Sequence, residues 1–358
     1  MSPLTDLDKV RQKIDGIDDT ILNLLKARGE LALHIKGLKQ GGSTYRPERE
    51  SEILHRLLNT NQGPLPEQAI ESIYRQIISA CRNLQKKITV AYLGPEGTYS
   101  HEATLKMFGV TADLVPHMSL PEAVRSAEKG TTDVVLLPIE NSTEGAVIET
   151  HRLLLKSDLK VCAELIIPIN HCLLTKARKL SDIKVIHAHP QALGQCREWL
   201  QLHVPGAELI NEASNGQAAL NVKKKSKHAA IAGPQASAIF DVPVLVSGIS
   251  DSANNYTRFI VLRQSAALPT GNDKTSMICS VRDKVGALHE LLSILAKHHV
   301  NLVRLESQPH ADHEYVFYID IEGHQAMPAI GKALDELSKA AKTCKILGSY
   351  PKGQYASF

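Results

Sequence analysis

Closely spaced cysteines are missing from this sequence of 358 residues. None of its six cysteines forms a CxxC pair, which argues against a zinc site and against a fold held together by disulfide bonds. We therefore expect reduced thiols and no bound metal. The six are Cys81, Cys162, Cys172, Cys196, Cys279 and Cys344.

The sequence also lacks a large net charge, a membrane-spanning run and a signal peptide, and each absence argues against a class of function or location. The 41 basic and 38 acidic side chains leave a formal charge of only +3, so composition supports neither a nucleic-acid partner nor a membrane partner. No apolar run approaches the length of a membrane span, and the N-terminus lacks the apolar core of a signal peptide. We expect a cytoplasmic protein, whose substrates can still be small acids if basic residues gather locally.

One long amphipathic helix is predicted from about residue 10 to the Gly41-Gly42 pair. Its apolar residues recur at steps of three and four, the spacing that places them on one face. Arg28 and Lys39 continue this face, because eleven residues at about 100° each return to within about 20° of the starting direction. Two cations thus share a face that should be apolar. The apolar residues are Ile14, Ile17, Ile21, Leu25, Ala32 and Ile35.

Two more helices are predicted, one starting at Pro47 and one at about Pro66. Polar residues lie beside their apolar faces: Arg49 and Glu50 on the first, and Gln85 on the second. Any single long side chain of this kind usually extends to solvent. Several together, with a carboxylate and an amide on neighbouring helices, favour a buried pocket for an anion, since guanidinium groups pair with carboxylates through two parallel hydrogen bonds.

This segment resembles the helical chorismate mutase family in the spacing of its charged residues and in the run from 24 to 33. The resemblance implies an intertwined dimer and a cofactor-free pericyclic rearrangement of chorismate to prephenate, helped by restraint and charge. The residues it places at the substrate are Arg11, Arg28, Lys39, Arg49, Glu50, Cys81 and Gln85. The arginines would hold two carboxylates, Arg11 coming from the partner. Lys39 and Gln85 would meet the ether oxygen and Glu50 the hydroxyl, while Cys81 stands where some relatives have serine.

The middle of the chain alternates predicted strands with predicted helices, the pattern of an α/β sheet. Strand signals fall at residues 88–93, 134–139, 164–169, 184–187 and 229–232. Ligands of such sheets bind beyond the carboxyl ends of the strands. Three polar loops could converge there: 140–145, 187–191 and 254–259. The turn at 94–100 contains glycines but no GK[ST] sequence, so we reject nucleotide binding.

The third loop, 254–259, leads directly into the apolar run 260–262. Polar groups beside a buried strand need partners or a ligand, although local capping would explain this loop taken alone. His187 and His189 also fit loop and capping positions better than a metal site, because no cysteine or carboxylate completes a ligand set.

Together these loops resemble prephenate dehydratase, through residues 94–100, 138–145, His189-Pro190-Gln191 and Thr257-Arg258-Phe259. The resemblance implies two α/β subdomains with the active site between them, as in periplasmic binding proteins, and conversion of prephenate to phenylpyruvate with loss of water and carbon dioxide. Thr257 would be the catalytic threonine. We expect it to donate a hydrogen bond to the leaving oxygen, since an unperturbed hydroxyl is a poor acid.

The candidate substrate-binding residues of this segment are Glu140, Asn141, Gln191, Ser214 and Arg258. Glu140 is also a candidate for a structural role. Arg258 could bind a substrate carboxylate or pair with Glu140 or Asp251, and the sequence leaves these alternatives open.

The last segment is predicted to fold in the order βαββαβ, a ferredoxin-like arrangement. Its expected elements are strand 275–281, helix 286–298, strands 300–307 and 315–321, helix 329–342 and strand 344–347. It resembles the phenylalanine-binding ACT domain through Gly286-Ala287-Leu288 and Glu306-Ser307-Gln308-Pro309. The resemblance implies an allosteric site at an interface between paired domains, made by Gly286, Ala287, Leu288, Glu306 and Ser307.

The predicted protein is therefore multidomain: an all-α mutase unit at 1–88, a dehydratase at 89–263, a linker at 264–273 and a regulatory domain at 274–358. This order implies the bifunctional chorismate mutase/prephenate dehydratase family. Chorismate and prephenate would be substrates of a homodimer, and phenylalanine would inhibit it, with the linker as the mechanical route. Two alternatives remain: the helices only dimerise and the dehydratase is the sole enzyme, or the chain is a non-catalytic binder of aromatic acids or amino acids.

Overall fold

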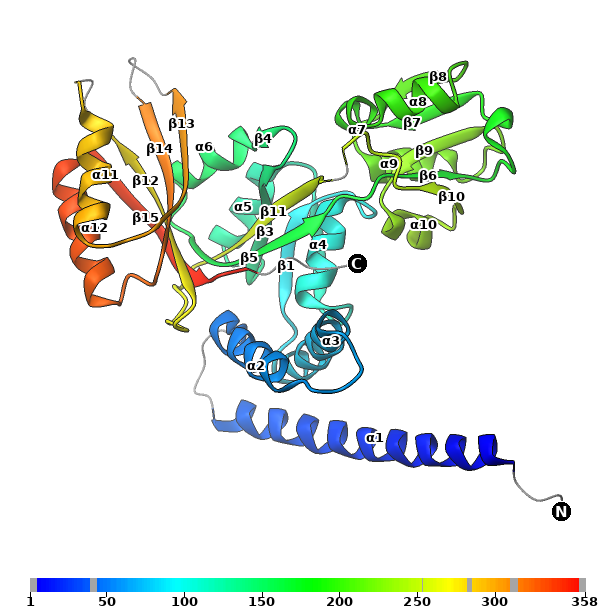
Figure 1. Ribbon diagram of the computed structural model, residues 1–358, viewed down its shortest axis with the longest axis horizontal. Helices are drawn as coiled ribbons and strands as arrows, with labels where there is room; N and C mark the ends of the chain where they lie inside the picture. Colours follow the sequence, from blue (N-terminus) through cyan, green and yellow to red (C-terminus); the bar gives the residue numbers. More distant parts are fainter. Residues whose placement is uncertain (1–4, 39–43, 253, 282–284, 310–314, 354–358) are drawn as a thin grey trace.

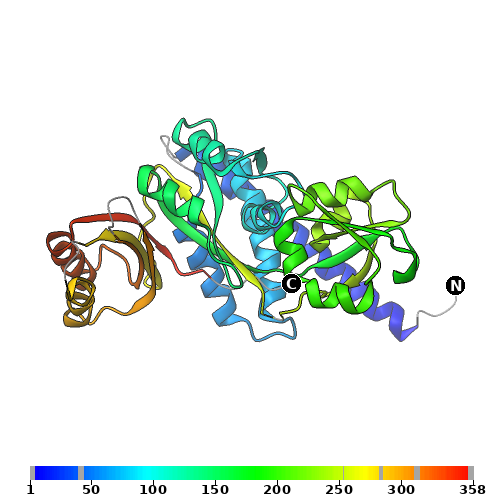
Figure 2. The ribbon, with the colours of Figure 1, turned by 90° about the horizontal axis from the view of Figure 1, so that it is seen from above.

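The computed structural model describes residues 5–38, 44–252, 254–281, 285–309 and 315–353. They form a helical unit and three β-sheets, with the first sheet between the other two and the helices beneath it (Figures 1 and 2). None of the helices in these ranges combines the length and the apolar character that crossing a membrane would require.

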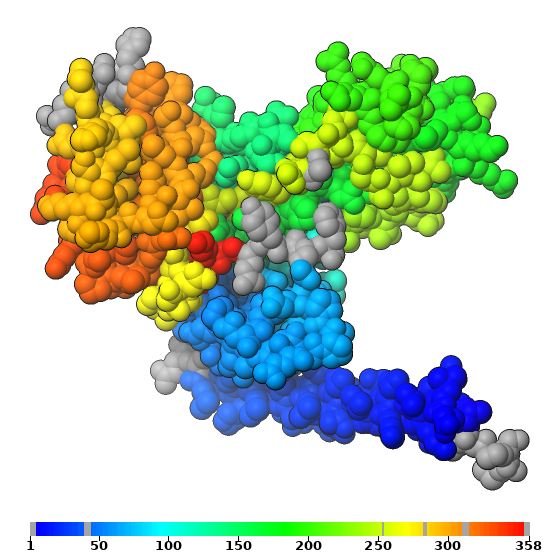
Figure 3. Space-filling model, viewed as in Figure 1, coloured from blue at the N-terminus to red at the C-terminus, as the bar shows by residue number. Residues whose placement is uncertain are grey.

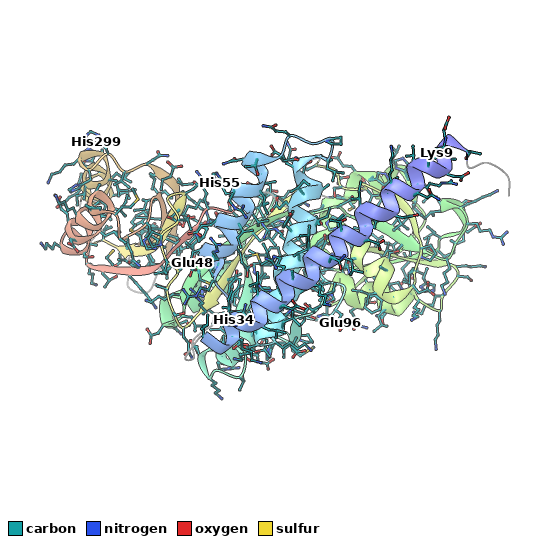
Figure 4. The ribbon with its side chains drawn as sticks, turned by 90° about the horizontal axis from the view of Figure 1, so that it is seen from below. Lys9, His34, Glu48, His55, Glu96 and His299 are labelled. Carbon is teal, nitrogen blue, oxygen red and sulfur yellow. The ribbon has the colours of Figure 1, made fainter. Side chains whose placement is uncertain are left out.

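The helical unit consists of α1 (Asp6–Leu38), α2 (Pro47–Thr60) and α3 (Glu67–Gln85), which confirms the three predicted helices. Proline occupies the start of α2 and the N-cap of α3, where no helical amide bond is lost. Within one chain the apolar face of α1 is uncovered: Ile17 is 58% exposed and Ala32 is the helix's buried residue. Figure 4 shows α1 crossing the underside, with Lys9 and His34 toward its opposite ends.

The first lobe is a sheet in the order β2-β1-β3-β11-β5, with β4 paired to β3. Its strands are β1 (Thr89–Leu93), β2 (Asp113–His117), β3 (Val134–Asn141), β4 (Gly145–Ala146), β5 (Lys160–Pro168) and β11 (Tyr256–Arg263), with helices α4 (Tyr99–Phe108), α5 (Leu120–Glu128) and α6 (Ile148–Lys156). Strand β11 runs antiparallel to both β3 and β5. The start of β11 therefore meets the end of β3, and Thr257 lies opposite Asn141.

The second lobe is a sheet in the order β10-β6-β9-β7-β8. Its strands are β6 (Cys172–Thr175), β7 (Val185–Ala188), β8 (Glu208–Asn211), β9 (His228–Ala232) and β10 (Val244–Ser247), and its helices are η1 (Leu180–Asp182), α7 (Pro190–Gln195), α8 (Arg197–His203), α9 (Asn215–Val222) and α10 (Pro234–Phe240). Two segments join the lobes, where the Ile169 amide donates to the Asn255 carbonyl at 2.8 Å. We refer to these two crossing segments, around His171 and around Asn255, as the hinge.

The C-terminal unit has the predicted βαββαβ order, with an antiparallel sheet ordered β13-β14-β12-β15. Its elements are β12 (Asp273–Ser280), α11 (Ala287–Lys297), β13 (Leu302–Pro309), β14 (Tyr315–Glu322), α12 (Pro328–Ala340) and β15 (Thr343–Pro351). Its sheet shares a buried apolar cluster with the first lobe. The packing is close, because a Cβ on Gly348 would lie 2.2 Å from the Val161 carbonyl oxygen. Figure 3 shows this unit lying directly against the rest of the chain.

Candidate active sites

A first cavity of about 460 Å³ lies between the three helices of the helical unit. Its polar lining brings together five of the residues predicted for the mutase site: Arg28, Arg49, Glu50, Cys81 and Gln85. Arg46 and Arg82 also line it, so four arginines face one glutamate. This excess of positive charge suits a ligand with two carboxylates.

The side chains of this cavity are held to different degrees. Arg28 comes from α1 and donates to the Ile77 carbonyl of α3 at 3.3 Å. Arg49 pairs with Glu52 at 3.0 Å on a largely exposed surface, where such a pair constrains the side chain weakly. Glu50, in contrast, pairs at 2.5 Å with Arg82, whose side chain is 4% exposed. The glutamate is therefore the firmly positioned group of the cavity.

Two predicted members are not among the described residues that line this cavity. Arg11 lies near the start of α1, exposed, 3.8 Å from Asp8. Lys39 falls outside the residues that the structure describes. Arg82 was missed by the sequence reasoning, since it lies among the apolar residues of α3 without any motif of its own.

A second cavity of about 550 Å³ opens between the two lobes. It brings together four predicted residues from four separate segments: Asn141 at the end of β3, Gln191 in α7, Ser214 before α9 and Thr257 at the start of β11. The three polar loops do converge, although Thr257 belongs to strand β11 and not to a loop. Because β11 is antiparallel to β3, its first residues reach the edge where β3 ends.

Thr257 is fixed by Asn141. The Asn141 Nδ2 amide donates to the Thr257 hydroxyl oxygen at 2.9 Å, and both side chains are buried. The Asn141 Oδ1 atom in turn accepts from the hydroxyl of Thr143 at 2.6 Å. Since the threonine oxygen accepts from the amide, its own proton remains available to donate to a ligand.

Gln195 ties this pair to the hinge. Its Nε2 donates to Thr143 at 2.6 Å, while its Oε1 accepts from Asn255 at 3.0 Å and from His171 at 2.8 Å. Because an amide oxygen only accepts, His171 carries a proton on Nε2. Its Nδ1 lies 3.0 Å from the hydroxyl of Tyr99, which donates to the Asn170 carbonyl at 3.0 Å. Burial lowers the pKa of His171 more than its bond to Gln195 raises it, which keeps the ring neutral.

The sequence reasoning did not single out Gln195 or His171. Neither side chain lies in a recognisable motif for such a role, and only the folding of α7 onto the hinge brings the two together. Both line the cavity beside Thr257.

Formal charge is missing from the described residues that line this second cavity: they include no lysine, arginine, aspartate or glutamate. Helix N-termini take their place. Thr98 caps α4 and Ser214 caps α9, each accepting from an amide of the first turn. The two ends lie together, because a Cβ on Gly216 would be 2.3 Å from the Glu96 carbonyl oxygen. Amide groups at such ends attract anions.

Arg258 points away from this cavity. Successive residues of a strand face opposite sides, so Thr257 and Phe259 line the cavity while Arg258 does not. Its guanidinium is buried against the C-terminal unit, 2.8 Å from Glu164 and 2.7 Å from Asp320. This placement favours the alternative in which Arg258 pairs with carboxylates of the protein over the one in which it binds a substrate carboxylate.

The alternative partners proposed for Arg258 fare differently. Asp251 accepts instead from the backbone amides of α8, each at 3.0 Å. Glu140 lies 3.9 Å from Arg258 and 3.3 Å from Arg304 of β13. Glu140 does not line the cavity either, so its place supports the structural alternative over substrate binding.

The predicted allosteric residues lie at two places on the C-terminal unit. Gly286, Ala287 and Leu288 form the start of α11, and Gly286 adopts a positive φ of 82°, which favours glycine. Glu306 and Ser307 lie on β13, one of the two edge strands of its sheet, where Glu306 pairs with Arg304. The structure places these residues without testing whether they bind a ligand.

Comparison with known families matches three consecutive parts of the chain. The family chorismate mutase type II matches residues 10–86, prephenate dehydratase matches 90–267 and the ACT domain matches 275–339. These stretches correspond to the helical unit, the two lobes and the C-terminal unit.

Known proteins and structures agree with this order. The bifunctional chorismate mutase/prephenate dehydratase of Aquifex aeolicus is 38% identical, over 98% of this chain and 99% of that protein. The protein of the same description from Pseudomonas aeruginosa is also 38% identical, over 98% and 99%. The crystal structure of prephenate dehydratase from Arthrobacter aurescens in complex with L-Phe is 33% identical over 74% of this chain and 90% of that one, with a TM-score of 0.68.

Proposed function

This chain belongs to the family of bifunctional chorismate mutase/prephenate dehydratases with an ACT domain, and we propose that its two cavities divide the two reactions between them. The cationic cavity of the helical unit rearranges chorismate to prephenate. The neutral cavity between the lobes converts prephenate to phenylpyruvate. The observation that carries this division is the charge of the linings, four arginines in one and no formal charge on the described lining of the other.

In the mutase cavity, Arg28 and Arg49 hold the substrate carboxylates, and Glu50 accepts a hydrogen bond from the ring hydroxyl. Gln85, at the end of α3, donates to the ether oxygen as its bond breaks and negative charge develops there. Cys81 lines the same wall and contacts the substrate. No group has to form a covalent bond or move a proton, because the arrangement of charges and the restraint of the substrate lower the barrier.

A homodimer completes this cavity. From residue 11 to residue 28 a helix rises about 25 Å, so Arg11 of one chain cannot reach the cavity that its own Arg28 lines. The exposed apolar residues of α1, such as Ile17 at 58% and Leu24 at 65%, form a face that a second α1 would cover. Pairing of two such helices brings the partner's Arg11 toward the open side of the cavity.

In the dehydratase cavity, backbone amides bind the carboxylates in place of cationic side chains. The N-termini of α4 and α9 bind the carboxylates of prephenate, and the side chains of Gln191 and Ser214 add polar contacts. Because amide groups carry only partial charges, they stabilise the departing carboxylate less than a buried cation would, and so oppose its loss of carbon dioxide less.

Thr257 assists departure of the ring hydroxyl. Asn141 donates into the threonine oxygen at 2.9 Å, which orients the threonine proton toward the cavity. That proton bonds to the leaving oxygen as it gains negative charge, and aromatisation of the ring drives the loss of hydroxide and carbon dioxide. Neutral His171 and Gln195 hold Asn141 and the hinge in place.

Phenylalanine regulates the dehydratase through the ACT domain. Support comes from the domain itself and from the related Arthrobacter aurescens structure, which holds L-Phe. We place the ligand near Gly286, Ala287, Leu288, Glu306 and Ser307. Inhibition requires that it bind one arrangement of the domains better than the other. Two connections could carry the effect of the ligand to the dehydratase site. One is the linker, and the other is the ion pair between Asp320 of the ACT sheet and Arg258, which follows Thr257 in β11, at 2.7 Å.

The compartment follows from the thiols. All six cysteines are free, and burial raises the pKa of the Cys162, Cys172 and Cys196 thiols, which makes these three poorly reactive. We place the enzyme in the cytoplasm, where such thiols stay reduced.

Incubation with chorismate, with prephenate and phenylpyruvate followed separately, tests the division of labour. We expect both products in sequence. Prephenate without phenylpyruvate would leave the lobes without their assigned reaction. Phenylpyruvate formed from added prephenate but not from chorismate would make the helices a dimerisation unit only. Neither product from either substrate would favour a non-catalytic binder.

A further inference from the structure

We propose that Arg82 is a positioning residue of the mutase site, which holds Glu50 toward the substrate hydroxyl and takes its own position from the dehydratase lobe. The proposal rests on the substrate contact assigned to Glu50 above. It adds a residue that does not touch the reacting bonds but acts through one that touches the substrate.

The Arg82–Glu50 pair is a close, largely buried contact of the cavity. The guanidinium Nη1 donates to Glu50 Oε1 at 2.5 Å, and the two side chains are 4% and 17% exposed. Removing one member of a buried ion pair costs much folding free energy, because the remaining charge is left buried without a partner. Glu50 is thereby kept at one place in the cavity wall.

Arg82 is anchored outside the helical unit. Its Nη2 donates at 3.0 Å to the carbonyl of Phe108, the last residue of dehydratase helix α4. The guanidinium carbon lies 5.3 Å from the ring centre of Tyr45 and 5.5 Å from that of Phe108. Both rings are fully buried in the core of the first lobe, so two aromatic faces and a fixed carbonyl restrict the cation.

The surroundings of Glu50 show why this restraint matters. Glu50 is the single carboxylate among the described residues that line the cavity, and Arg28 and Arg49 line it too. Without Arg82, the Glu50 carboxylate is free to turn to those arginines. It would then occupy the groups that bind the substrate and leave the hydroxyl without an acceptor. Loss of Arg82 should therefore both raise KM for chorismate and lower kcat.

The test compares full-length variants with chorismate and with prephenate as separate substrates. For Arg82→Met, we expect mutase kcat/KM to fall by about 10- to 100-fold, while dehydratase kcat/KM on added prephenate stays within about twofold. Arg82→Lys keeps one charged donor to Glu50 and should recover part of the loss. Arg75→Met is the matched control, since Arg75 lies on the same helix, pairs with Glu71 at 2.6 Å and does not line the mutase cavity.

A double variant separates positioning from simple destabilisation. If Arg82 acts through Glu50, then Glu50→Gln with Arg82→Met should be no slower in the mutase reaction than Glu50→Gln alone. Three results would each overturn the proposal. The first is a double variant whose loss of mutase activity is the product of the two single losses. The second is an equal fall of mutase and dehydratase activity in Arg82→Met, and the third is normal mutase kinetics in Arg82→Met when Glu50→Gln is impaired. A normal Glu50→Gln enzyme would instead remove the role assigned to Glu50, and with it the basis for Arg82.

Discussion

Asp320 offers the sharpest test of the contact between the ACT sheet and the catalytic strand. Its carboxylate lies 2.7 Å from the Arg258 guanidinium and accepts from Ser276 at 2.5 Å, with 9% of its side chain exposed. The change Asp320→Asn keeps the shape and removes the charge. Glu322→Gln makes the same change two residues later in β14, where Glu322 pairs with Lys352 at 2.7 Å and both side chains are about 40% exposed.

The expected magnitudes differ because burial differs. Removing one partner of a buried ion pair costs about 3–5 kcal/mol, and we expect the lower end because Arg258 keeps Glu164 at 2.8 Å. An exposed pair contributes about 0–1 kcal/mol. A cost of about 3 kcal/mol corresponds to an equilibrium change of roughly a hundredfold.

Hydrogen exchange of the β14 and β11 amides measures this cost locally. We expect Asp320→Asn to lower protection in both strands by about a hundredfold, and Glu322→Gln to change it less than tenfold. Inhibition by phenylalanine should weaken in the first variant, since one connection between the ACT sheet and Thr257 is lost. Equal protection in the two variants would refute the idea that Arg258 couples the domains.

The pH dependence gives a second check of the same contact. Burial raises the pKa of Asp320. The nearby charges of Arg258 and Lys274 and the hydrogen bond from Ser276 together lower it by more than burial raises it, so the pKa lies below the ordinary value. A lowered carboxyl pKa contributes stability above the unfolded pKa of about 3.9, and that stability disappears as the pH falls through the folded value. The difference between wild type and Asp320→Asn should therefore shrink in acid. An equal difference at pH 7 and at the lowest pH where the protein stays folded would contradict the ionic origin.

Three further outcomes are expected. Thr257→Ala should lower dehydratase kcat by about 10²- to 10³-fold with little change in the mutase rate, and Thr257→Ser should retain most dehydratase activity. Arg28→Ala should lower the mutase rate and leave the dehydratase nearly unchanged. A variant that loses both activities while folded would show that the sites are not independent. Ile17→Asp on the open face of α1 should give a smaller particle in light scattering and lose mutase activity, and an unchanged mass would argue against dimerisation through this face. Burial lowers the pKa of His171, so its contribution to stability is complete above about pH 6.5 and falls as the pH decreases. Urea unfolding at pH 5 and pH 7 should therefore show a smaller difference in unfolding free energy for His171→Gln than for the wild type. An equal difference in the two proteins would contradict this role.

Much of the fold and part of each site could be predicted from the sequence. Apolar spacing identified the helices and the βαββαβ order, because these periods are properties of the local chain. The loops that hold Asn141, Gln191 and Thr257 were expected to converge, since the carboxyl ends of strands in an α/β sheet gather at one edge. Ser214 was a substrate-binding candidate of the family resemblance, and the structure places all four residues on one cavity.

Other residues could not be found this way. The strand pattern puts Thr257 and Arg258 on opposite faces of β11, but it does not say that the second face meets the ACT sheet. Gln195 and Arg82 carry no local signal, because each acquires its role from partners that are distant in the chain: Gln195 from His171 of the hinge and Arg82 from Phe108.

The loop 254–259 separates the two kinds of information most clearly. Its residue types, and the buried strand that follows them, can be predicted from composition and local periodicity. That Thr257 faces the cavity between the lobes, while Arg258 faces Glu164 and Asp320, follows from the tertiary structure. A strand has two faces, and the elements packed against each face determine what its side chains contact.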